Sequence, residues 1–149
     1  MKRILVAIDL METTDSVINY AKLFAKKLKS ELLIIHSEAI ESYIASITIG
    51  LNQQPSNSLI NEQKMIFEDR LKKIHLNLEK EGVKANCLLL DGPTVENILK
   101  EAKKFKSDLI VIGSHKHGKF HHLLLGSIHE SLISHSPIPI MIIPPLKEK

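Results

Sequence analysis

One short run of the chain reads Asp108-Leu109-Ile110-Val111-Ile112-Gly113-Ser114. Its aliphatic residues follow one another without a polar residue between them, which is typical of a strand covered on both faces of a parallel sheet. Glycine and serine then favour a tight connection out of the strand. The run therefore predicts a buried strand at 109–112 that is followed by a loop.

Similar aliphatic runs predict further strands at 4–8, 32–36, 85–90 and 138–143. The segments between them have apolar residues at helical spacing, with helix ends expected at Gly82 and Pro137. Strict alternation of strands and helices predicts one α/β domain over 1–149, an open, doubly wound, Rossmann-like parallel sheet of five strands with four helices in an α/β/α sandwich. In each predicted helix the apolar residues at helical spacing would face the sheet. In chain order the four sets are Val17, Tyr20, Ala21, Phe24 and Leu28; Ile60, Phe67, Leu71, Ile74 and Leu78; Val95, Ile98, Leu99, Ala102 and Phe105; and Leu125, Ile128, Leu132 and Ile133.

Two segments lack a sustained pattern. Residues 38–57 combine Gly50, Pro55 and several amides, and this predicts a long mobile loop. The tail at 146–149 is rich in lysine and is expected to be frayed.

Composition excludes several classes of protein. The chain has 149 residues, 44% of them hydrophobic, with a net charge of +3 and the single cysteine Cys87. It is therefore neither disordered nor a disulfide scaffold, and we expect an inert core thiol in a cytoplasmic protein. No apolar run approaches the roughly 20 residues that span a bilayer. Because 20 basic residues lie among 17 acidic ones and aromatic residues are only 4%, nucleic-acid binding is not expected.

A ligand of such a sheet binds beyond the carboxyl ends of its strands, where the strand order reverses. The predicted connections place this reversal between the first and fourth strands. Asp9 ends the first strand and could accept hydrogen bonds from ligand hydroxyls, or it could cap the next helix.

The loop after the fourth strand reads Gly113-Ser114-His115-Lys116-His117-Gly118-Lys119-Phe120-His121-His122-Leu123-Leu124-Leu125-Gly126-Ser127. Glycines can present bare amides, a helix N-terminus at Gly126 and Ser127 favours anions, and two lysines add positive charge, all of which suit phosphate. The alternative is that the glycines only shape the connection and Ser127 only caps the helix.

At these residues the chain resembles the universal stress proteins of the UspA family. The resemblance rests on residues 4–9, Leu33-Ile34-Ile35-His36, Asp91-Gly92-Pro93, residues 108–114, Leu124-Leu125-Gly126-Ser127 and Ser136-Pro137-Ile138-Pro139-Ile140. It implies a small stress-response module that binds ATP or AMP, with Mg²⁺ if ATP is bound. Asp9 would then contact the ribose or adenine, the backbone near Ser37 the base, and Gly113, Gly126 and Ser127 the phosphates. Ser114, His115, Lys116 and Gly118 complete the candidate site.

One position departs from the family motif G-x2-G-x9-G-[ST]. Its second glycine falls on Lys116, whose side chain either blocks the approach of a phosphate or pairs with it. A universal stress dimer that binds no nucleotide and acts through protein contacts is therefore an alternative.

The last predicted strand, Ile138-Pro139-Ile140-Met141-Ile142-Ile143, is apolar and bracketed by prolines. Proline is tolerated on edge strands, and an apolar edge needs cover. A second copy of the chain would supply that cover, and family members commonly dimerise through the corresponding strand, so the resemblance also implies a homodimer. The alternative cover is the 38–57 segment.

Four histidines, His115, His117, His121 and His122, crowd one loop. Imidazoles at this spacing could hold Zn, Ni or Cu, so a metal-responsive protein is a further alternative, although no carboxylate or thiolate accompanies them. No G-x-S-x-G and no residue suited to activating water is evident. An efficient enzyme is not expected; any ATP hydrolysis would be slow.

Overall fold

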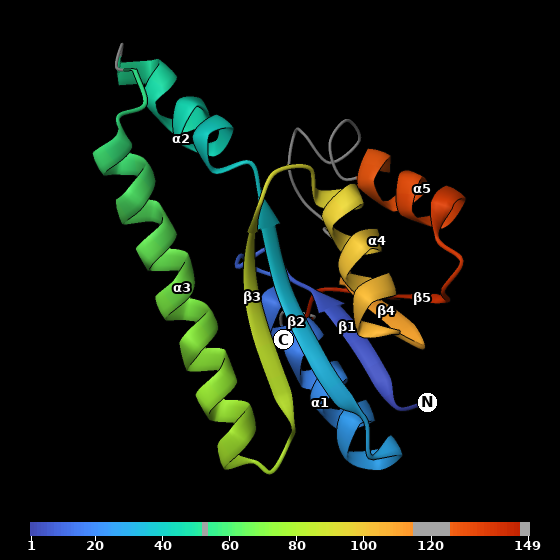
Figure 1. The fold of residues 1–149 in the computed structure, drawn as a ribbon. Helices are drawn as coiled ribbons and strands as arrows, with labels where there is room; N and C mark the ends of the chain where they lie inside the picture. Colours follow the sequence, from blue (N-terminus) through green and yellow to red (C-terminus); the bar gives the residue numbers. More distant parts are fainter. Residues whose placement is uncertain (52–53, 115–125, 147–149) are drawn as a thin grey trace.

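The computed structural model of the chain describes residues 1–51, 54–114 and 126–146. Within these ranges strands and helices follow one another along the chain, as Figure 1 shows. In order they are β1 (Arg3–Ala7), α1 (Thr14–Leu28), β2 (Glu31–Glu38), α2 (Ile40–Thr48), the 3₁₀ helix η1 (Ile49–Leu51), α3 (Asn57–Lys80), β3 (Ala85–Asp91), α4 (Thr94–Phe105), β4 (Leu109–Gly113), α5 (Gly126–His135) and β5 (Ile140–Ile143).

The strands form one parallel sheet in the order β3-β2-β1-β4-β5. β1 lies at the centre, with Val6 opposite Ile34 of β2 on one side and Val111 of β4 on the other. The chain moves outward from β1 in one direction through β2 and β3, and in the other through β4 and β5. The predicted doubly wound topology, with its reversal between the first and fourth strands, is confirmed.

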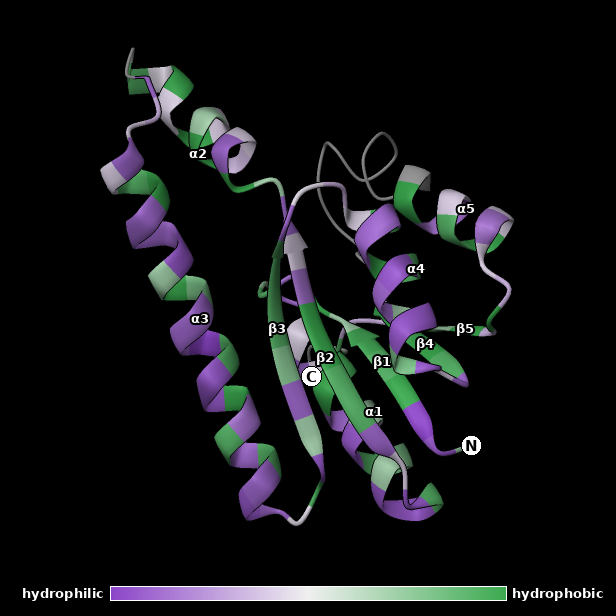
Figure 2. Cartoon of the chain, in the orientation of Figure 1, coloured by the Kyte–Doolittle hydropathy of each residue, from purple (hydrophilic) through white to green (hydrophobic). Residues whose placement is uncertain are grey.

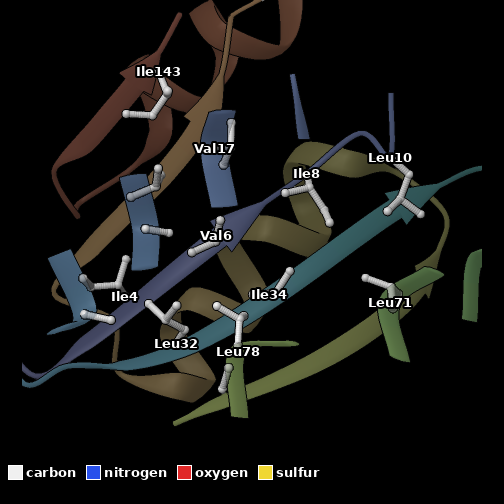
Figure 3. Close-up of a cluster of buried hydrophobic side chains, with 14 of the residues drawn as sticks. Ile4, Val6, Ile8, Leu10, Val17, Leu32, Ile34, Leu71, Leu78 and Ile143 are labelled. Carbon is white, nitrogen blue, oxygen red and sulfur yellow. The ribbon is translucent and has the colours of Figure 1, made fainter. Parts of the chain in front are cut away.

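Helices cover both faces of the sheet. Successive side chains of a strand point to opposite faces, and here apolar side chains on both faces need cover. Ile4 and Val6 pack with α1, α2 and α3 on one face, whereas Leu5 packs with α4 and α5 on the other. Figure 2 shows mostly hydrophobic residues in the central strands and hydrophilic residues over much of the helical surface. Figure 3 shows Val17 beside β1, with Leu71 and Leu78 on the side of β2 and β3. This is the predicted α/β/α sandwich.

The prediction of a long mobile loop at 38–57 was wrong. Most of that segment is helical, so the described residues hold five α-helices rather than the four predicted. Ile40 and Ile44 of α2 are buried, and Tyr43 packs against the Phe67 ring of α3 at 5.8 Å. The first free amide of α2, at Ile40, donates to Asp91 Oδ1 at 3.2 Å. The cap of α2 thus comes from β3, far away in the sequence.

β5 is an edge strand of the described sheet, as its prolines predict. It begins at Ile140, two residues later than expected, because Ser136 and Ile138 form a local turn in which the Ile138 amide donates to Ser136 Oγ at 3.1 Å. Pro139 has no amide hydrogen, although its carbonyl still accepts from Ile110 N at 2.9 Å.

Two smaller expectations concern the tail and the thiol. Residues 147–149 lie outside the described residues, so the frayed tail stays a prediction. Cys87 is a free, half-buried thiol in β3, and burial raises its pKa to about 11, which keeps it protonated and unreactive at neutral pH. None of the helices that the structure describes has the length and apolarity needed to cross a membrane.

Candidate functional site

Asp9 lies just beyond the carboxyl end of β1, at the reversal of strand order. Its Oδ1 accepts hydrogen bonds from Met11 N at 2.8 Å and Thr14 Oγ1 at 3.1 Å, and its Oδ2 accepts one from Thr13 Oγ1 at 3.1 Å. Thr13, the residue that precedes α1, makes no side-chain cap bond. Asp9 therefore organises the turn that leads into α1, and this turn holds the carboxylate in one orientation at the end of the sheet.

His36 fixes the same end of β1 from the neighbouring strand. Its ring is 1% exposed, its Nδ1 lies 2.9 Å from the Ile8 carbonyl oxygen, and it meets the Phe67 ring edge-on at 4.6 Å. Burial lowers the pKa of His36, so the ring is neutral at pH 7 and its Nδ1–H donates to Ile8. The residue before Asp9 is thereby tied to β2.

Gly113 ends β4 beside the first turn of α1. A Cβ added there would lie 2.7 Å from Thr13 Oγ1 and 3.0 Å from Val17 Cγ2. The absent side chain therefore allows α1 to pack against β4, which gives Gly113 a structural role whether or not it meets a phosphate. Its carbonyl accepts a hydrogen bond from His129 Nε2 of α5 at 3.0 Å, and Ser114 N donates to Ile143 O at 2.8 Å.

Ser37, near the carboxyl end of β2, faces α4. Its hydroxyl accepts from Asn97 Nδ2 at 2.9 Å, and its carbonyl accepts from Thr94 Oγ1 at 3.2 Å. The side chain is buried. Next to it, burial raises the pKa of Glu38. The sequence singled out Ser37 but not its partners in α4.

The structure brings together part of the predicted site. Asp9 follows β1, Gly113 ends the adjacent strand β4 with Ser114 directly after it, and Ser37 lies near the end of β2. Gly126 and Ser127 begin α5. The remaining candidates, His115, Lys116 and Gly118, lie outside the described residues, as do His117, His121 and His122 of the predicted metal cluster. In the described ranges no three His, Cys, Asp or Glu side chains gather around a possible metal position.

Sequence reasoning missed His36, His129 and Asn97. Each binds a backbone or hydroxyl group that is remote in the sequence, so no local pattern marks its partner. The one available signal was a histidine at the end of an otherwise aliphatic second strand, since a buried imidazole needs a hydrogen-bond partner.

A model of the "Universal stress protein family" matches residues 1–144 of this chain. Among similar proteins is universal stress protein MJ0577 of Methanocaldococcus jannaschii, which is 28% identical over 152 residues, covering 95% of this chain and 94% of the relative. The solved structure of MJ0577 aligns with a TM-score of 0.76 at 28% identity, over 99% of this chain and 98% of that one.

Two more distant structures share the fold. A universal stress protein from Archaeoglobus fulgidus, solved in complex with dAMP, has a TM-score of 0.65 at 20% identity and covers 96% of this chain and 98% of its own. A universal stress protein solved in complex with cAMP has a TM-score of 0.64 at 16% identity, over 96% of each chain. Because the family model matches residues 1–144, which run from β1 through β5, this chain belongs to the universal stress protein family.

Proposed function

We propose that this protein binds an adenine nucleotide, AMP or ATP, at the carboxyl ends of β1 and β4. The observation that carries the proposal is the Asp9 carboxylate, to which Met11 N, Thr13 Oγ1 and Thr14 Oγ1 donate hydrogen bonds where the strand order reverses. This is the place where doubly wound sheets bind ligands. Complexes of related universal stress proteins with dAMP and cAMP support the choice of an adenine nucleotide.

The proposed contacts divide between two ends of the ligand. Asp9 would accept hydrogen bonds from the ribose or adenine, and the backbone near Ser37 would meet the base. Gly113, Ser114, Gly126 and Ser127, with His115, Lys116 and Gly118 between them in the sequence, would hold the phosphates through amides and the start of α5. Mg²⁺ would accompany ATP.

The protein would act as a cytoplasmic, dimeric binding or signalling module that carries out little or no ATP hydrolysis. The proposed dimer joins two copies along β5, the edge strand that prolines bracket. Its Ile142 side chain is 43% exposed on this edge strand, and a second copy of the chain would cover it.

A second candidate function follows from Lys116. If its side chain blocks the phosphates, the protein would be a dimer that acts through protein contacts alone. The two candidates differ in a measurable way, because replacement of Lys116 by glycine restores the family motif.

Isothermal titration of the untagged chain with AMP and with ATP plus Mg²⁺ tests both candidates. For the first we expect saturable heat in the parent, weaker binding by Asp9→Asn, and no gain by Lys116→Gly. Asp15→Asn, an exposed carboxylate in the first turn of α1, is the matched control and should bind like the parent. Nucleotide affinity that arises only in Lys116→Gly would favour the second candidate, a dimer without nucleotide. Absence of binding heat from the parent at millimolar nucleotide would exclude the first candidate, the nucleotide-binding protein.

A further inference from the structure

A second concave region lies at the opposite end of the sheet, where the strands begin. It has a volume of about 600 Å³. It is formed by the segments that precede or begin β1, β2, β3 and β4 and by the residues that follow α1 and α4. Figure 1 shows α1 and α4 both ending on the side where the strands start. The residues that line it are Met1, Lys2, Arg3, Lys29, Ser30, Glu31, Lys84, Lys106 and Asp108.

This basal pocket is strongly cationic. Five lysine or arginine side chains line it against two carboxylates, an excess that equals the net +3 of the entire chain. The carboxyl ends of α1 and α4 add roughly half a negative charge each, so an excess of about two positive charges is left. The small overall charge of the protein is thus concentrated at one place.

Both carboxylates already have partners. Asp108 Oδ2 accepts from the backbone amides of Lys2 at 2.6 Å and Arg3 at 3.0 Å, and these bonds lower its pKa. Glu31 Oε1 lies 3.3 Å from Lys84 Nζ. Among the residues that the structure describes, Lys2, Lys29 and Lys106 have no carboxylate within ion-pair distance. These three ammonium groups are available to an anion.

Two of these lysines also have an uncommon backbone conformation for a residue with a side chain. Lys29 has φ 53° and Lys106 has φ 55°, both left-handed, and each follows the last residue of a helix. Glycine adopts this left-handed conformation at a lower conformational cost than lysine, and glycine is the residue that most often ends a helix in this way. Lysine at both positions brings two charges to one pocket, from helices on opposite faces of the sheet.

We propose that this basal pocket binds a small multivalent oxyanion with three or more negative charges, such as a short oligophosphate. Its volume lies within the range of small-molecule sites, and its charge suits an anion rather than an apolar ligand. β1 has five residues, so at about 3.3 Å per residue the pocket is about 17 Å from the Asp9 end of the sheet. One mononucleotide at Asp9 would not reach it, and the proposal is independent of nucleotide binding.

Inorganic tripolyphosphate is the probe, titrated into the full chain at low and at 0.3 M salt. We expect saturable binding that weakens with salt and a rise in melting temperature. Lys29→Gln with Lys106→Gln should weaken binding about tenfold, whereas Lys72→Gln with Lys73→Gln, an equal loss of charge on the exposed side of α3, should not.

A second double variant separates binding from folding. Lys29→Gly with Lys106→Gly removes both charges while it suits the left-handed backbone, so the protein should stay as stable as the parent and still lose affinity. Asp9→Asn should bind tripolyphosphate like the parent. The proposal would be overturned if Lys72→Gln with Lys73→Gln lowered the affinity for tripolyphosphate equally. It would also be overturned if AMP displaced tripolyphosphate and Asp9→Asn abolished its binding.

Discussion

The hydrogen atom that Gly113 carries in place of a side chain decides how closely α1 approaches β4. In Gly113→Ala the new methyl group would meet Thr13 and Val17 at 2.7–3.0 Å. Because these atoms belong to a packed helix, we expect a loss of about 1–3 kcal/mol in the free energy of unfolding, measured with urea.

The control for this substitution is Gly50→Ala. No atom lies within 4 Å of a Cβ at Gly50, so the change should stay within about 0.5 kcal/mol. Equal stability of the two variants would show that α1 does not need the space at Gly113.

His36 makes stability depend on pH. Burial lowers its pKa in the fold, with a smaller contribution from Arg70, while the Ile8 carbonyl and Asp9 oppose the shift. His36 therefore binds a proton more readily in the unfolded state than in the folded state. The contribution of the neutral ring is present above about pH 6.5 and is lost as the pH falls through the lower pKa of the folded state.

Unfolding free energies measured between pH 7.5 and 5 should therefore decline in the parent. In His36→Asn the decline should be shallower, because the group that titrates is gone. His135→Gln, at the exposed end of α5, is the control and should follow the parent. A His36→Asn profile as steep as that of the parent would assign the pH dependence to other groups.

At the scale of elements, α2 depends on a residue outside itself. Asp91 Oδ1 accepts from Ile40 N, and its Oδ2 lies 3.9 Å from Lys64 Nζ. We expect Asp91→Ala to cost about 1 kcal/mol and to speed amide hydrogen exchange within α2. Lys64→Ala removes only the long, exposed ion pair and should do neither. Unchanged exchange in Asp91→Ala would mean that burial of Ile40 and Ile44 alone holds α2.

The contrast between α2 and the other elements shows what sequence could predict. The strands and the remaining helices have apolar patterns that are local, and their alternation fixes the topology. α2 is short, and its cap and its Phe67 contact come from β3 and α3, so its own residues resemble a loop. The site divides in the same way: Asp9 was predictable from its place after a strand, whereas His36 and His129 act on carbonyl groups that only the tertiary fold brings near.

At the scale of the molecule, the sheet has two edges with different properties. β5 has four residues between prolines, and β3 has seven without proline. If two copies join along β5, Ile142→Lys should convert the dimer to a monomer in light scattering, because a buried charge would meet its own copy across the two-fold axis.

Leu88→Lys places the same charge on the β3 edge, where Leu88 is 37% exposed, and should leave the dimer intact. A dimer that persists in Ile142→Lys and is lost in Leu88→Lys would show that the interface lies at β3. A parent that is monomeric at 100 μM would contradict the proposed dimer.

The two ends of the molecule have separate proposed roles, and one measurement addresses the nucleotide site directly. AMP is titrated into ¹⁵N-labelled protein while the backbone amide shifts are followed. We expect saturable shifts of the amide signals of Asp9, Thr13, Ser37 and Ser114 and at the start of α5, with no shift of the Lys29 and Lys106 amides. Absence of shifts at millimolar AMP, or shifts confined to the basal pocket, would contradict it.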